Sequence, residues 1–253
     1  MLLLKLIIIP LAVLGLGIME RLHGPRVAGW LSGFPVVALP LLLFITLDHG
    51  EAFGSESALG AWYGLVAWLS FAMTYSWCSR FLNWFWCILV SFAVWTVMAV
   101  VMLEAQRLSA WTGLLPVLAF GVALLAYPRG EASDEQREHV WWGLPVRMLA
   151  GAVLTLVITQ FSDSLGTRWS GLFSTFPMIG SVIAVSNHIQ YGPRAVQEAV
   201  AGMSMGLASI GAFCFSLYML LPQMGVWAAF GLALLASSTA HALTYLLFKH
   251  KKA

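Results

Sequence analysis

Apolar stretches of about 20 residues recur along most of the chain, and that is the length a helix needs to cross the hydrocarbon core of a bilayer. Sixty per cent of the 253 residues are hydrophobic and nine per cent are charged, whereas about 25% of the residues of an ordinary soluble domain are charged. A soluble protein of this length could not bury so much apolar surface. The sequence therefore predicts an all-α integral membrane protein with many spans.

The apolar stretches predict nine transmembrane helices. The predicted spans are residues 2–19, 27–48, 58–79, 81–104, 109–127, 144–162, 169–190, 197–220 and 223–248.

One internal repeat organises these spans, because nine pairs of identical residues are 142 positions apart with no gap. The pairs are Gly29 and Gly171, Ser32 and Ser174, Phe34 and Phe176, Pro35 and Pro177, Gly50 and Gly192, Glu56 and Glu198, Gly60 and Gly202, Gly64 and Gly206, and Phe71 and Phe213. The repeat predicts a first four-helix unit over residues 1–104 and a second over 144–253. Residues 105–143 form a linker helix and a charged loop between them.

The number of crossings sets the relative orientation of the two units. Five predicted spans separate the start of the first unit from the start of the second, and an odd number inverts the second copy. Inverted repeats are the architecture of many alternating-access transporters. The fifth span, 109–127, has no counterpart and is expected to act as a peripheral reversing linker.

Lys and Arg residues in the loops predict the orientation in the membrane. Ten of them share one side: Arg21, Arg26, Arg80, Arg129, Arg137, Arg147, Arg194, Lys249, Lys251 and Lys252. The other side holds Lys5, Arg107 and Arg168. We expect the N-terminus outside and the C-terminus in the cytoplasm of a bacterial cell, with the chain in the inner membrane.

Each half also carries a matching set of charges. Lys5 aligns with Arg147, Arg26 with Arg168, and Glu56 with Glu198 at the entrances of spans 3 and 8. Intramembrane charges usually pair and often mark a substrate path, which makes the four bases candidate substrate-binding residues and the two acids candidate gates. The alternative is that the bases are interfacial anchors whose long side chains reach the membrane surface.

A Ser-x-Phe-Pro element lies inside spans 2 and 7. Its interior prolines, Pro35 and Pro177, each remove a helical hydrogen bond and predict a kinked or broken helix. The exposed N–H groups of such a break can face a substrate, and the candidate substrate-binding residues are Ser32, Phe34, Pro35, Ser174, Phe176 and Pro177. The alternative is a packing kink satisfied by neighbouring helices.

Two further features have structural alternatives. The G-x-x-x-G pairs at 60 and 64 and at 202 and 206 predict close helix packing. The alternative is that Met203, Ser204 and Met205 line a cavity with Ser209. His241 lies in a polar patch in mid-span, where it is either a proton-coupling group or a hydrogen-bonded packing residue. The sequence contains no metal-binding, nucleotide-binding or hydrolase motif, so we expect no cofactor, no metal and no enzymatic activity.

Two short segments carry a family resemblance. Residues 4–6 with their apolar run, and residues 26–35 with their Ala-Gly and Phe-Pro pairs, resemble the small bacterial inner-membrane proteins of the GlpM type. The second half keeps Arg147 and the segment 170–177. The resemblance implies a fused, inverted pair of such units, in an architecture similar to that of dual-topology small transporters.

Three functions remain open on this evidence. The leading hypothesis is a secondary transporter of a small, anionic metabolite. The second is a flippase for a lipid or lipid phosphate, and the third is a non-transporting subunit of an envelope-biogenesis complex. The expected partners are membrane lipids and the substrate, with a homodimer possible and no nucleic acid.

Overall fold

The computed structural model describes residues 30–108, 113–126 and 166–250, together with residues 11, 14–15, 18, 145–146, 149, 153 and 164. The predicted spans 2–19 and 144–162 lie almost wholly outside the described residues. The predicted site residues Lys5, Arg26 and Arg147 lie outside them as well.

All secondary structure in the described part of the chain is helical. The helices are α3 (Ala38–His49), α4 (Glu51–Cys78), α5 (Trp84–Leu108), α6 (Leu115–Ala126), α8 (Met178–Met224) and α9 (Val226–His250). Four segments within the described residues are long and apolar enough to cross a membrane: Trp84–Gln106, Gly166–Ile189, Tyr191–Met224 and Val226–Thr244. These findings agree with the predicted all-α, multi-pass membrane protein. The count of nine helices extends beyond the described residues and stays a prediction.

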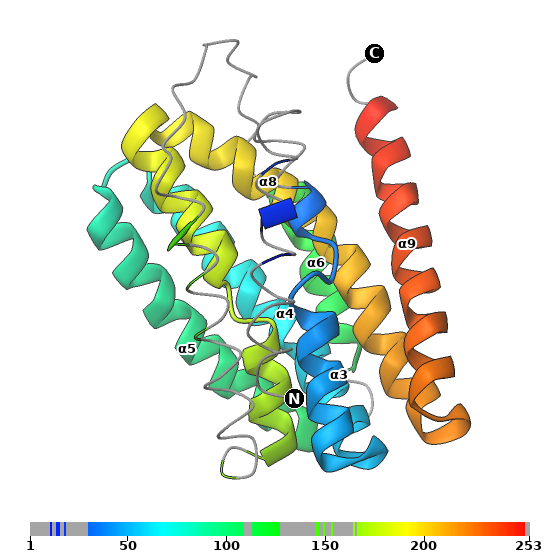
Figure 1. Ribbon diagram of the computed structural model, residues 1–253. Coiled ribbons are helices and arrows are strands. Elements are labelled where there is room, and N and C mark those ends of the chain that lie inside the picture. Colours follow the sequence, from blue (N-terminus) through cyan, green and yellow to red (C-terminus); the bar gives the residue numbers. More distant parts are fainter. Residues whose placement is uncertain are drawn as a thin grey trace.

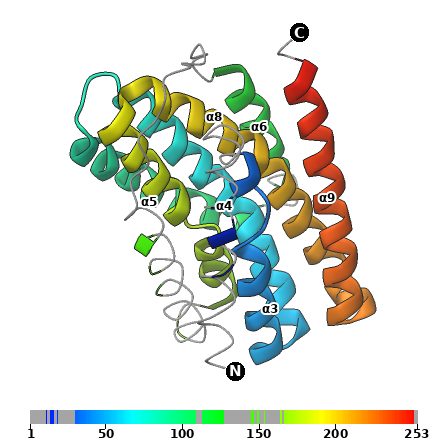
Figure 2. The same ribbon diagram turned by 45° about the horizontal axis from the view of Figure 1, so that its top comes forward.

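Helix α4 is the centre of the bundle and packs against α3, α5, α6 and α8. Figure 1 and Figure 2 both show α9 along α8 at one edge of the bundle and α5 on the far side of α4. The largest buried side chains include Phe71 and Tyr75 of α4 and Phe213 of α8. The core therefore lies between segments that are far apart in the sequence.

Glycines with positive φ make sharp turns in the bundle, and two of them occupy equivalent positions in the two halves. Gly50, with φ +90° and ψ 171°, separates α3 from α4, and Gly192, with φ +75° and ψ −169°, divides α8 into two arms. Backbone of this kind favours glycine because it has no Cβ. The two glycines are 142 positions apart and adopt nearly the same conformation.

The predicted span 27–48 is interrupted between residues 33 and 37, around the interior proline that predicted a kink or break, and the helix resumes at α3. Two predicted boundaries were wrong. Helix α4 begins at Glu51 rather than at 58, so Glu56 lies inside the helix rather than at its entrance. The fifth predicted span, 109–127, forms its α-helix from Leu115. Hydropathy identifies the part of a helix that lies in the hydrocarbon core of the membrane. The helix itself can continue through polar residues beyond that part.

Candidate functional site

The first helix break occupies residues 33–37. Gly33 and Phe34 still donate their N–H groups to carbonyls three residues earlier, at 3.1 Å and 3.0 Å. Pro35 has no N–H to donate, and the Val36 N–H turns back to the Phe34 carbonyl at 2.7 Å. The helical ladder restarts when Leu39 donates to the Pro35 carbonyl at 2.9 Å. The interior proline thus breaks the helix, as predicted.

The second break has the same hydrogen bonds at the equivalent positions. Thr175 and Phe176 donate three residues back, at 3.2 Å and 3.0 Å, and the Met178 N–H bonds the Phe176 carbonyl at 2.7 Å. Ser181 then donates to the Pro177 carbonyl at 2.8 Å and restarts the ladder. The two breaks therefore share one local backbone structure.

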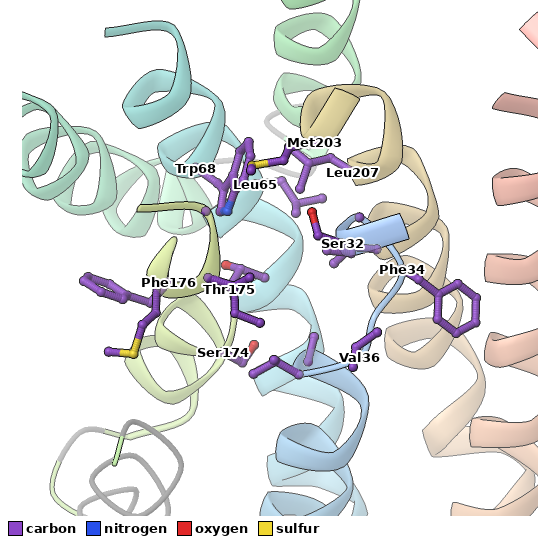
Figure 3. A pocket seen from close by; sticks show the side chains of 17 residues that line it. Ser32, Phe34, Val36, Leu65, Trp68, Ser174, Thr175, Phe176, Met203 and Leu207 are labelled. Carbon is purple, nitrogen blue, oxygen red and sulfur yellow. The ribbon is translucent and has the colours of Figure 1, made fainter. Parts of the chain in front are cut away.

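Both breaks line a single cavity of about 60 Å³ between the helices. It is lined by Ser32, Gly33, Phe34, Val36, Val37, Ala38, Leu65, Trp68, Ser174, Thr175, Phe176, Met178, Ile179, Gly180, Met203, Leu207 and Ile210. Figure 3 shows Ser32, Ser174 and Thr175 around the cavity, with Trp68 and Met203 closing one end. A metabolite site normally has about 300–1,000 Å³. The cavity as it stands holds only a small ion or a few waters.

Hydroxyl groups and helix N-termini provide the polarity of this cavity. The Ser174 hydroxyl donates to the Gly171 carbonyl at 2.6 Å, and the Thr175 hydroxyl donates to the Leu172 carbonyl at 2.9 Å. Each hydroxyl oxygen keeps lone pairs that can accept a hydrogen bond, while its proton is donated to a backbone carbonyl. The helices that restart at α3 and α8 have no side-chain cap, and their first residues line the cavity. Uncapped first-turn N–H groups favour negative charge.

Glycines hold each break against a helix of the other half of the chain. A Cβ at Gly206 would overlap the backbone of Gly33 and the carbonyl of Trp30. A Cβ at Gly64 would overlap the Thr175 hydroxyl and press on the Leu172 carbonyl. Gly60 is held in the same way against the Arg168 carbonyl. These contacts confirm the packing role predicted for glycines 60, 64 and 206.

The two phenylalanines line the cavity through part of their atoms and turn their rings away from it. Figure 3 shows Phe34 directed toward α9 and Phe176 directed to the opposite side. The Phe176 ring stacks on Phe92 at 5.4 Å and meets Trp95 edge-on at 4.8 Å. The Phe34 ring meets His241 edge-on at 5.5 Å. Each break therefore anchors its ring on a helix of the other half.

His241 lies beside the first break rather than in the cavity. It is 8% exposed, its ring stacks on Trp30 at 3.8 Å, and neither ring nitrogen has a hydrogen-bond partner among the residues that the structure describes. The Trp30 indole N–H donates instead to the Thr244 hydroxyl at 3.1 Å. The predicted alternative of a hydrogen-bonded packing histidine was wrong, because the packing is present and the side-chain hydrogen bonds are not.

The predicted charged residues that the structure describes, Arg168, Glu56 and Glu198, do not line the cavity. Arg168 lines a separate pocket of about 240 Å³ with Glu104, Gly166 and Trp169. Glu56 is exposed on α4, and Glu198 is half-buried on α8. Pro35 and Pro177 are buried without lining the cavity. The structure thus brings together Ser32, Phe34, Ser174 and Phe176 from the predicted set.

Sequence reasoning missed most of the cavity's apolar lining. The missed residues include Leu65 and Trp68 of α4 and Leu207 of α8, and Thr175 adds a hydroxyl. Met203 lines the cavity, as the alternative to a packing role predicted. Thr175 could have been predicted as a lining residue, because it directly follows Ser174 and aligns with Gly33. Leu65 aligns with Leu207, but nothing in an apolar helix marks which leucine faces a break.

Within the described residues, no group of three or more His, Cys, Asp or Glu side chains is placed to hold a metal ion. Residues 2–108 match a family described as protein of unknown function, DUF3147. The matched segment ends at Leu108, where α5 ends. No curated protein and no solved structure matches the chain. The resemblance to the GlpM type and the fused, tandem arrangement stay predictions.

Proposed function

We propose that this protein is a secondary transporter that moves a small anion across a bacterial inner membrane by alternating access between two inverted repeats. The observation that carries the proposal is the cavity between the Phe34–Pro35 and Phe176–Pro177 breaks. Both halves contribute to it at equivalent positions: Ser32 and Ser174, Gly33 and Thr175, Phe34 and Phe176, Val36 and Met178, Val37 and Ile179, Ala38 and Gly180, and Leu65 and Leu207.

Contacts between the halves support a two-fold relation. The contact of Gly206 with the Trp30 carbonyl becomes, after a shift of 142 positions with the halves exchanged, the contact of Gly64 with the Leu172 carbonyl. The turns at Gly50 and Gly192 follow the same shift. Paired discontinuous helices at a repeat interface are where transporters of this architecture bind substrate.

The restarted helices favour an anion. The first turns of α3 and α8 both line the cavity without a side-chain cap. Each helix N-terminus carries the equivalent of about half a positive charge, and its effect is strong where water is excluded. Because a cavity of about 60 Å³ admits only a small ion, a larger substrate requires an open state.

Each break lies between helices of the opposite half, which suggests how access could alternate. Gly206 and Phe34 tie the first break to α8 and α9, while Gly64 and Phe176 tie the second break to α4 and α5. Rocking of one half against the other would open the cavity first to one side and then to the other. The orientation proposed here has the C-terminus in the cytoplasm.

Uptake by protein reconstituted into liposomes tests the proposal. Proteoliposomes are screened with a panel of small inorganic and carboxylate anions, and the hit is repeated with Ser32→Ala, Ser174→Ala and Thr175→Val. We expect each substitution to lower uptake about tenfold or more, as for loss of a charge-assisted hydrogen bond. For Ser174 and Thr175, the bound anion would draw the hydroxyl proton away from the Gly171 or Leu172 carbonyl. Ser238→Ala is the matched control, because this exposed hydroxyl donates to the Leu234 carbonyl of its own helix and does not line the cavity. Equal uptake by all four variants, or no uptake of any anion, contradicts the proposal.

A further inference from the structure

A second pocket lies at the end of the bundle where the α4–α5 turn meets the bend of α8. It has a volume of about 460 Å³ and is lined by Arg80, Tyr191, Pro193, Arg194 and Gln197. The positive φ of Gly192 makes the bend, so that Tyr191 and Arg194 reach the pocket from the two arms of α8. Figure 1 shows this bend close to the α4–α5 turn. None of these residues lines the cavity between the breaks.

The lining has the chemistry of a phosphate site. Two guanidinium groups, Arg80 and Arg194, face the pocket, and its described lining contains no carboxylate. Arginine forks match phosphate oxygens with paired, charge-assisted hydrogen bonds. Gln197 adds a side-chain amide to this lining, and the residue is 7% exposed. An amide N–H can donate to a phosphate oxygen beside the two arginines.

Exposed aromatic rings around the same turn indicate the level of the membrane at which the pocket lies. The turn and its flanks carry five large aromatic side chains between 40% and 85% exposed: Trp77 at 49%, Phe81 at 82%, Trp84 at 43%, Phe85 at 51% and Trp86 at 51%. The Arg80 guanidinium lies 4.9 Å from the centre of the Trp77 ring. Aromatic belts with adjacent basic residues mark the level of the lipid headgroups. A ligand at this level is most readily a lipid.

We propose that this pocket binds the phosphate group of an anionic phospholipid. The proposal is independent of transport, because the pocket and the cavity share no lining residue. The equivalent positions in the other half are His49, Glu51, Ala52, Ser55 and Pro222. Pro222 and Ala52 there replace the two arginines, Ser55 replaces the amide, and Glu51 adds an acid in place of Pro193. The site therefore belongs to one face of the membrane only. A lipid bound there would stabilise one orientation of the protein in the membrane.

Thermal unfolding in lipid nanodiscs tests this site. The full-length protein is compared in phosphatidylcholine nanodiscs with and without phosphatidylglycerol. A lipid that binds only the folded state raises its apparent stability, and we expect Tm to rise by about 2–4 °C, the shift that follows about 1 kcal/mol in a chain of this size. Arg80→Gln and Arg194→Gln should each remove at least half of this rise.

Gln197→Leu separates a specific site from a general charge effect, because it leaves the net charge unchanged. We expect it to reduce the rise as well, while Arg168→Gln, which removes one charge from the other described pocket, retains it. Each variant is first compared with the parent in phosphatidylcholine alone, so that loss of folding is seen directly. An undiminished rise in Arg80→Gln and Arg194→Gln, or an equal loss in Arg168→Gln, overturns the proposal.

A second arm distinguishes a lipid from a soluble phosphate. Inorganic phosphate is added to the protein in phosphatidylcholine nanodiscs without anionic lipid. We expect a smaller shift than phosphatidylglycerol gives, because the lipid is concentrated in the membrane plane beside the exposed aromatic rings. A shift as large with inorganic phosphate as with the lipid would overturn the lipid assignment.

Discussion

At the first break the ring of Phe34 lies edge-on to His241, whereas at the second break the ring of Phe176 stacks on Phe92 and meets Trp95. The backbone hydrogen bonds of the two breaks agree at equivalent positions. The two halves thus share the backbone structure of the break and differ in the side chains that pack against it. His241 aligns with Ala99, so the polar group belongs to one half alone.

This difference separates a rigid break from a break that can respond to protons. An aromatic cluster such as that around Phe176 is satisfied by packing. A buried imidazole without hydrogen-bond partners costs free energy in the folded state. Such a cost at an interface between repeats is typical of a group that acts during the transport cycle. We therefore propose His241 as the coupling residue and the Phe176 side as the fixed support.

The largest expected effect concerns the glycines that hold the two breaks. Gly206→Ala should destabilise the protein more than Gly64→Ala, because its Cβ would overlap backbone atoms of Gly33 and Trp30. The Cβ at 64 would overlap only the movable Thr175 hydroxyl, and it would lie 3.2 Å from the Leu172 carbonyl oxygen. Overpacking costs about 1–3 kcal/mol, and contacts with backbone lie at the upper end. Thermal unfolding in detergent measures both variants.

Removing the obstructing hydroxyl sharpens that comparison. Thr175→Ala should restore most of the stability lost in Gly64→Ala and none of that lost in Gly206→Ala, because Thr175 contacts only the first of these glycines. Equal rescue of both variants would show that the two contacts are not independent.

The next effect concerns the aromatic rings. Phe176→Ala should lower the free energy of unfolding by about 2–3 kcal/mol and Phe34→Ala by about 1 kcal/mol, because aromatic pairs contribute about 0.5–1.5 kcal/mol each beyond their burial. Phe176 makes ring contacts with Phe92, Trp95 and Phe173, while Phe34 makes one with His241. Unfolding in detergent again provides the measurement. A larger loss of unfolding free energy in Phe34→Ala than in Phe176→Ala would indicate that the first break, and not the second, is the rigid one.

The smallest effect on stability is expected at His241. His241→Phe should leave Tm unchanged or raise it by about 2–4 °C, because an apolar ring replaces a buried imidazole without partners. Uptake driven by a proton gradient should fall to the background level in the same variant. His49→Phe is the control, since its ring stacks on Phe53 at 4.7 Å, away from both breaks. Normal proton-driven uptake in His241→Phe would remove the coupling role.

The sequence predicted the backbone of the site better than its side chains. Interior prolines break helices for a local reason, so Pro35 and Pro177 located both breaks without knowledge of the tertiary structure. The repeat then predicted that the breaks would be equivalent, and their hydrogen bonds agree. The partners of the rings were not predictable, because the contact of Phe34 with His241 joins segments more than 200 residues apart.

Charge positions were informative for topology and less so for the cavity. Matching bases and acids in the two halves predicted a charged path, but Arg168 lines another pocket and Glu56 is exposed. The cavity instead gains its polarity from hydroxyl groups and uncapped helix starts. The amino-acid composition does not show that backbone dipoles point into a cavity. The sequence indicates them through the positions of the helix breaks.

The most direct test of alternating access is the reactivity of a single cysteine in the cavity. Cys78, Cys87 and Cys214 are first replaced by alanine, and Ser174→Cys is then treated in oriented proteoliposomes with a small, membrane-impermeant thiol reagent applied from one side at a time. The account predicts labelling from each side, because each repeat in turn opens the cavity. Labelling from one side only, or from neither side while uptake persists, would contradict it.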